Sequence, residues 1–209
     1  MSSSGNSKSE PTFLFAHGAG AGMDSDWMRQ MAGLVEKQGI NVVRFDFPYM
    51  RLIKQTGRRR PPDRMPKLIA AFETVIDSLA DCEKLIVGGK SMGGRVASLL
   101  ACQPQWQSKL AGVICLGFPF HPPAKPDKCK GEHLATMAIP TLLLQGERDS
   151  MGSREELSRY QLSERIELHF MPDGDHSFKP RVKSGLNLAD NQLHASRLIA
   201  KFIDQMVAI

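Results

Sequence analysis

Short apolar runs alternate with longer amphipathic stretches along the whole chain, and this alternation limits the possible folds more than any other feature. Runs of strand length lie at 12–16, 41–47, 84–87, 112–116, 141–144 and 166–170. The stretches between them place apolar residues at helical spacing. Strands that are apolar throughout are typical of parallel sheets covered on both faces. The pattern predicts a doubly wound, mostly parallel α/β sheet of about six strands with helices on both faces.

Helix signals lie in three of the amphipathic stretches. Pro66 suits the first turn of a helix that carries Leu68, Phe72, Val75, Ile76 and Leu79. A last helix carries Ala195, Leu198, Ile199, Phe202, Ile203 and Met206, and Asp24 is expected to cap a helix with Trp27, Met28, Met31 and Val35. The segments 48–66 and 117–131 are expected to be loops.

Composition restricts the class of protein. The chain has 209 residues, 42% hydrophobic and 23% charged, which predicts a single domain over 11–209 behind a disordered Ser-rich tail at 1–10. No apolar run approaches the roughly 18 residues that cross a bilayer, and the first ten residues lack the apolar stretch of a secretory signal. The four cysteines form no C-x-x-C pair. We therefore expect a cytoplasmic protein that uses no membrane, metal or cofactor.

A glycine-rich turn follows the run at 84–87 and leads into a helical stretch. It reads Gly88-Gly89-Lys90-Ser91-Met92-Gly93-Gly94. Gly89-x-Ser91-x-Gly93 matches the G-x-S-x-G turn that presents a nucleophilic serine between a strand and a helix. A phosphate-binding loop would need a glycine where the chain has Lys84. The context favours Ser91 as a nucleophile, and a plain tight turn is the simpler alternative.

A serine nucleophile needs a base, and the later loops supply one. The run at 141–144 leads to Glu147 and Asp149, and the run at 166–170 leads to His176. Ser91, Asp149 and His176 follow one another in the order that a nucleophile-elbow fold requires. Asp149 is preferred to Glu147 because it lies further into its loop.

The segment His17-Gly18-Ala19-Gly20-Ala21-Gly22 follows the first strand. Its backbone can approach a substrate oxygen closely, so the amides of Ala19 and Met92 are expected to form an oxyanion hole. His17 is expected to act as a hydrogen-bonding scaffold rather than as a catalyst. A dinucleotide-binding fingerprint would need glycine or alanine where the chain has Met23, and it would leave the serine, aspartate and histidine unexplained.

Positive charge gathers in one stretch of a chain whose net charge is +5. No aromatic residue lies between Met50 and Phe72, and prolines interrupt the segment, so a nucleic-acid partner is not expected. Two interpretations stay open: a solvated loop, or a cationic rim that attracts anionic substrates. The basic residues are Arg51, Lys54, Arg58, Arg59, Arg60, Arg64 and Lys67. The candidates for contact with substrate are His17, Gly18, Arg58, Arg59 and His121.

These motifs together resemble the α/β-hydrolase superfamily over nearly the whole chain. The resemblance rests on the elbow at Ser91, the glycine loop at His17, the Gly146-x-x-Asp149 turn and the Asp175-His176-Ser177-Phe178 loop. The segments 17–22, 44–50 and 117–123 are similar to small bacterial hydrolases related to dienelactone hydrolase. They are also similar to a group that includes a testis-expressed vertebrate protein and a chromatin acetyltransferase subunit. The resemblance implies a Ser–His–Asp esterase, thioesterase or related hydrolase.

The connection at 117–140 is too short and too rich in proline for the helical cap that many such hydrolases carry. An open site without an apolar lid does not suit long-chain lipids. We therefore expect a serine hydrolase whose partner is a small-molecule acyl substrate, either neutral or anionic. The alternative is an interaction module that keeps the fold without catalysis, and the sequence specifies neither the natural substrate nor the oligomeric state.

Overall fold

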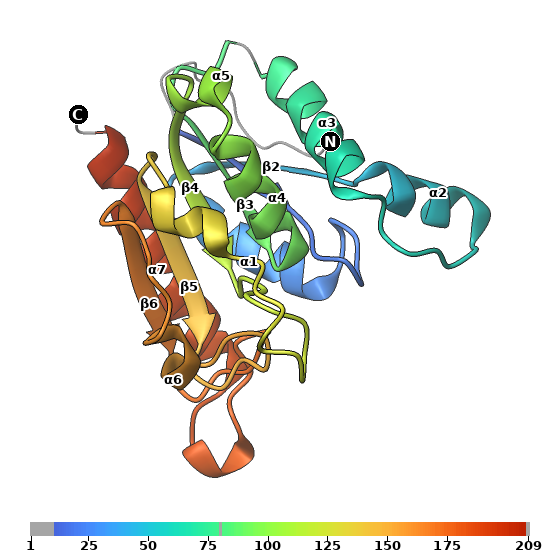
Figure 1. The fold of residues 1–209 in the computed structure, drawn as a ribbon. Helices are drawn as coiled ribbons and strands as arrows, with labels where there is room; N and C mark the ends of the chain where they lie inside the picture. Colours follow the sequence, from blue (N-terminus) through green and yellow to red (C-terminus); the bar gives the residue numbers. More distant parts are fainter. Residues whose placement is uncertain (1–10, 80, 208–209) are drawn as a thin grey trace.

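One sheet of six parallel strands forms the centre of the protein (Figure 1). The structure is a computed structural model, and it describes residues 11–79 and 81–207. The strands lie in the order β2-β1-β3-β4-β5-β6, and all neighbouring pairs are parallel. The predicted α/β class is confirmed, whereas the tail predicted at 1–10 lies outside the described residues. The strands are β1 (Thr12–Ala16), β2 (Asn41–Phe45), β3 (Leu85–Lys90), β4 (Leu110–Leu116), β5 (Thr141–Gly146) and β6 (Ile166–Met171).

Helices cover both faces of the sheet, which explains why its strands are apolar throughout. On one face lie α1 (Asp26–Glu36) and α7 (Leu188–Val207); on the other lie α3 (Met65–Asp77) and α4 (Met92–Ala101) (Figure 1). Side chains of one strand alternate between the two cores. Phe13 and Phe15 join the core beneath α1 and α7, while Leu14 joins the core beneath α3 and α4. Because all six strands are parallel, their carboxyl ends lie at the same edge of the sheet.

The prediction of a loop over 48–66 is wrong for the first half of this segment, because a helix, α2 (Pro48–Thr56), forms there. Pro48 occupies the first turn, Tyr49 and Met50 are buried, and Gly57 ends the helix with a φ of 67°. The basic side chains obscured this helix in the sequence. Shorter helices lie in other connections: α5 (Pro104–Gln107), α6 (Arg154–Leu157), and the 3₁₀ helices η1 (Glu132–Thr136) and η2 (Val182–Ser184).

The start of α1 also differs from the prediction. Its N-cap is Ser25, without a side-chain capping bond, and Asp24 instead accepts a hydrogen bond from Lys54 Nζ at 2.7 Å. Lys54 also contacts Asp46, at the end of β2. A lysine that sequence reasoning assigned to a loop therefore ties α2 to the segment before α1.

The connection between β4 and β5 folds closely onto the core over residues 117–140. Phe118, Phe120 and Leu134 are fully buried, and the two phenylalanine rings pack edge to face at 4.9 Å. Apart from η1, the connection is irregular, so no helical cap lies over the sheet edge, as expected. Within 11–79 and 81–207, no helix combines the length and apolar character needed to span a membrane.

Candidate active site

Ser91 occupies the turn between β3 and α4 in a backbone conformation that L-residues rarely adopt, with φ 51° and ψ −115°. A strained turn of this kind exposes the serine Oγ above the sheet edge. Glycines make the turn possible, because β1 approaches it closely. A Cβ on Gly89 or on Gly93 would lie 2.6 Å from the carbonyl oxygen of Ala16. Both positions therefore require glycine.

Ser91, His176 and Asp149 form a continuous chain of hydrogen bonds. His176 Nε2 lies 2.8 Å from Ser91 Oγ, and His176 Nδ1 lies 2.8 Å from Asp149 Oδ2. Because an ionised carboxylate can only accept, the network assigns the proton to Nδ1, and Nε2 accepts from the serine hydroxyl. The geometry places a base where it can remove the serine proton.

Asp149 is fully buried and held by two further donors. Gln145 Nε2 donates to Oδ2 at 2.8 Å, and the Met151 amide donates to Oδ1 at 2.8 Å. Gln145 also bonds both the amide and the carbonyl of Phe118, so it fastens the acid to the loop after β4. Sequence reasoning missed Gln145, although a polar residue closing an apolar strand was a usable signal.

Glu147 lies in a different network. It accepts a hydrogen bond from the Asp173 amide at 2.7 Å and pairs with Arg154 at 3.0 Å. The structure therefore brings Asp149, and not Glu147, to the imidazole. Asp175 forms a turn of its own loop by accepting from the amides of Ser177 and Lys179, as expected for this residue.

The glycine loop after β1 passes beside the nucleophile. A Cβ on Gly18 would lie 3.6 Å from Ser91 Cβ. The Tyr49 hydroxyl fixes the loop by donating to the carbonyls of Gly18 at 3.3 Å and Ala19 at 2.9 Å. Burial, together with Asp46 and Asp63, raises the pKa of Tyr49, so its hydroxyl stays protonated. The backbone of Ala19 is thereby held in place beside Ser91.

The Met92 amide begins α4 directly after Ser91. The first amides of a helix have no carbonyl of a preceding turn to bond, and they point out of its positive end. A negative charge that develops next to Ser91 would meet this end of α4.

His17 lies beneath the glycine loop and not in the cavity. The side chain is fully buried, Nε2 accepts from the Phe47 amide at 3.1 Å, and Nδ1 donates to the Gly18 carbonyl at 2.7 Å. Both ring nitrogens are therefore occupied by backbone groups. The structure therefore does not place His17, a predicted substrate contact, in the cavity wall, and its geometry is that of a scaffold.

We expect His17 to make the fold sensitive to acid. Burial lowers the pKa of His17 from 6.5 and outweighs the bond to Gly18 and the attraction of Asp46. Below pH 6.5 the imidazole of His17 takes up a proton in the unfolded chain but stays neutral in the folded chain. The stability that depends on the neutral imidazole is therefore complete above pH 6.5 and decreases as the pH is lowered further. Between pH 7 and pH 5, the free energy of unfolding measured in urea should decrease more for the native chain than for His17→Gln. Equal losses in the two proteins would contradict this expectation.

Ser91 and His176 open into a cavity of about 320 Å³. Its walls are mostly small or apolar, and Lys90 is the one lysine or arginine among the described residues that line it. Sequence reasoning did not assign Trp27, Met28, Lys90 or Met151 to the site, because apolar helix positions and a strand end gave no chemical signal. The lining residues are Gly18, Ala19, Gly20, Ala21, Ser25, Trp27, Met28, Lys90, Ser91, Met151, His176 and Ser177.

Three predicted substrate contacts lie elsewhere. Arg58 and Arg59 are exposed beyond the end of α2 and do not line the cavity. His121 is buried, with its Nδ1 at 2.9 Å from the Pro122 carbonyl, and it does not line the cavity either. The structure does not bring these three residues to the cavity, because chain order alone does not show where a loop turns after leaving the sheet edge.

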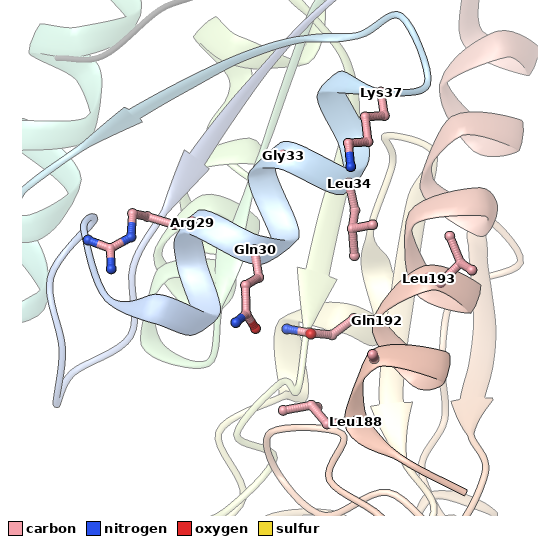
Figure 2. Close-up of a pocket in the computed structure, with 9 residues that line it drawn as sticks. Arg29, Gln30, Gly33, Leu34, Lys37, Leu188, Gln192 and Leu193 are labelled. Atoms are coloured by element: carbon pink, nitrogen blue, oxygen red, sulfur yellow. The ribbon is translucent and has the colours of Figure 1, made fainter.

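A larger hollow of about 610 Å³ lies between α1 and α7 (Figure 2). Figure 2 shows Gln30 and Gln192 pointing toward one another from the two helices, with Leu34 and Leu193 nearby. None of the predicted site residues lines it, and it holds no nucleophile paired with a base. Its size therefore does not make it the candidate site. Across the described residues, no cluster of three or more His, Cys, Asp or Glu side chains could hold a metal ion.

Comparisons with known proteins agree with this architecture. A family model described as an alpha/beta hydrolase domain matches residues 9–204. Est1E from Butyrivibrio proteoclasticus, solved with ferulic acid, is similar with a TM-score of 0.72 at 12% identity, covering 98% of this chain and 92% of that one. Dienelactone hydrolase from Anabaena variabilis has a TM-score of 0.68 at 22% identity, covering 94% and 86%. An alpha-beta serine hydrolase homologue from Coxiella burnetii has a TM-score of 0.68 at 18% identity, and the match covers 91% of this chain and 84% of that one. Because all three identities are 22% or lower, these similarities show a shared fold and no more.

Proposed function

Because this chain belongs to the alpha/beta hydrolase family, we propose that it is a serine hydrolase acting on a small or polar ester, thioester or related acyl compound. The observation that carries the proposal is the hydrogen-bond chain from Ser91 through His176 to Asp149, with both bonds at 2.8 Å. Two esterases and a dienelactone hydrolase are among the proteins of known structure with a similar fold, which supports hydrolysis as the reaction class.

In the proposed first half-reaction, Ser91 Oγ attacks the substrate carbonyl while His176 Nε2 takes the hydroxyl proton. Asp149 stabilises the imidazolium that forms, and its two other hydrogen-bond donors hold its carboxylate in place. The amides of Ala19 and Met92 donate to the developing oxyanion, each contributing about 2.7–4 kcal/mol by analogy with measured oxyanion donors. His176 then returns the proton to the leaving group, which departs and leaves an acyl group on Ser91.

In the second half-reaction, His176 takes a proton from water, which attacks the acyl carbonyl. The same two amides stabilise the second tetrahedral intermediate, and its collapse releases the acid and restores the Ser91 hydroxyl. No cofactor takes part in this cycle. The glycine and alanine wall at 18–21 and the cavity volume of about 320 Å³ favour a compact acyl group over a long lipid chain.

A fluorophosphonate probe tests the proposal directly. The probe should phosphonylate Ser91 alone among the serines, because only a serine activated by a base attacks it at a useful rate. The adduct is located by peptide mass spectrometry, and heat-denatured protein serves as the control. An unmodified Ser91, or an adduct on another serine, would contradict the assignment and favour the alternative of a non-catalytic interaction module.

We also propose a cytoplasmic location. All four cysteines, Cys82, Cys102, Cys115 and Cys129, are free thiols, and Cys115 is fully buried. Unpaired thiols suit a reducing compartment. Tagged protein followed by cell fractionation is the test, and recovery in a secreted or membrane fraction would contradict it.

A further inference from the structure

Lys90 is the residue immediately before Ser91, and the reaction described above does not use it. Its side chain is only 8% exposed, yet it lines the cavity. The ammonium donates to the carbonyl oxygen of His176 at 2.6 Å and lies 5.5 Å from the centre of the Trp27 ring. The charge therefore sits between the nucleophile turn, the base loop and α1, at the wall where a substrate would bind.

The positive charge has no carboxylate partner in the described part of the chain. An ammonium has three N–H donors, and the structure gives it one hydrogen bond, to a neutral carbonyl. Asp149 and Asp175 attract it from a distance, but Asp149 Oδ2 is bonded to His176 and Gln145, and Asp175 Oδ1 is bonded to two amides of its own loop. A buried charge that is left unpaired is costly, so its presence in a cavity wall calls for an explanation.

The electrostatics of Lys90 are dominated by its burial. Burial lowers the pKa of Lys90 to about 8, despite the attraction of Asp149 and Asp175. The titratable groups around the ammonium are these two carboxylates and His176, while α1 presents the neutral ring of Trp27. At pH 7 the amine is mainly charged, and near pH 9 it is mainly neutral.

We propose that Lys90 is the specificity-determining residue of the cavity and binds a carboxylate carried by the acyl substrate. This inference rests on the proposed function and names its substrate class: esters or thioesters with a carboxylate close to the scissile bond. A substrate carboxylate would accept from the two N–H groups that bond no described residue, in surroundings where apolar side chains strengthen the pair. The anion is thus recognised inside the cavity by Lys90, and not by Arg58 and Arg59, which the sequence suggested.

The test measures the concentration of an ester that halves the rate at which fluorophosphonate labels Ser91. Monoethyl succinate is compared with ethyl 4-methylpentanoate, and acetoxyacetate with isobutyl acetate; each pair has nearly the same shape, and only one member is anionic. At pH 7 the anionic member of at least one pair should act at a concentration at least about tenfold lower, as expected for a charged hydrogen bond. This preference should largely disappear at pH 9 and in Lys90→Met, and it should persist in the Arg58→Gln/Arg59→Gln double variant.

Each outcome separates the possibilities. If the native chain shows no preference, or keeps it at pH 9, the inference is wrong, and this arm does not require the Lys90 variant to fold. If Lys90→Met remains folded by circular dichroism and keeps the preference for the anionic esters, Lys90 does not bind the carboxylate and only positions His176. Loss of the preference in the arginine double variant would return recognition to the rim. If Ser91 is not labelled at all, the proposed function fails first.

Discussion

Replacing Ser91 by alanine should lower kcat by about 10⁵- to 10⁶-fold on any ester that the protein cleaves, because the attacking oxygen is removed and the remaining groups act as one unit with it. The melting temperature should change little. Among the described residues the Ser91 side chain hydrogen-bonds only His176, and alanine is as compatible as serine with the positive φ at this turn. Initial rates with a chromogenic short-chain ester and a thermal melt provide the two measurements.

Ser158→Ala is the matched control for this change. Ser158 is exposed, and within the described part of the chain its hydroxyl donates only to the Glu155 carbonyl, at the end of α6. It should keep the native kcat. If Ser91→Ala kept kcat within tenfold of the native chain, or still reacted with fluorophosphonate in the cavity, another residue would be the nucleophile.

Asp149→Asn should lower kcat by about 10⁴-fold. An amide of the same shape cannot hold the proton on His176 Nδ1 as a carboxylate does, and it does not stabilise the imidazolium that forms during attack. The variant also disturbs a fully buried group, because Gln145 donates to the oxygen that would become part of an amide. Circular dichroism should therefore accompany the kinetics, to show that the variant is folded.

Glu147→Gln provides the comparison. Glu147 contacts the Asp173 amide and Arg154, both outside the cavity, so kcat should remain within a few-fold of the native value. If Glu147→Gln lost most of its kcat while Asp149→Asn kept nearly the native value, Glu147 and not Asp149 would be the residue that orients His176. Comparable losses in both variants would indicate that the loop conformation, and not one carboxylate, supports His176.

Periodicity was sufficient to predict the six strands, since a strand buried on both faces has to be apolar along its whole length. Their ends were less accessible. Gly88, Gly89 and Lys90 were interpreted as part of the turn, but they continue β3, because backbone pairing with β4 runs on to Lys90 whatever the side chains are. Gly88 is required by the neighbouring strand, as a Cβ there would lie 2.0 Å from the Ile114 carbonyl.

Residues whose environment depends on distant segments could not be placed from the sequence. His17 is surrounded by Phe47 and Gly18 backbone groups, and neither spacing nor composition shows that both of its nitrogens are occupied. Lysine side chains are ordinarily exposed, yet Lys90 is buried and bonds the carbonyl of His176. In both cases tertiary contacts override the ordinary preference of the side chain.

The short connection between β4 and β5 affects how substrate and product exchange with solvent. In hydrolases with a folded cap, opening and closing add a step in microseconds to milliseconds that can limit turnover. Here Phe118, Phe120 and Leu134 anchor the connection in the core, and residues 117–140 form no folded helical cap over Ser91. For the proposed hydrolase, substrate and product then exchange with solvent without the opening of such a cap.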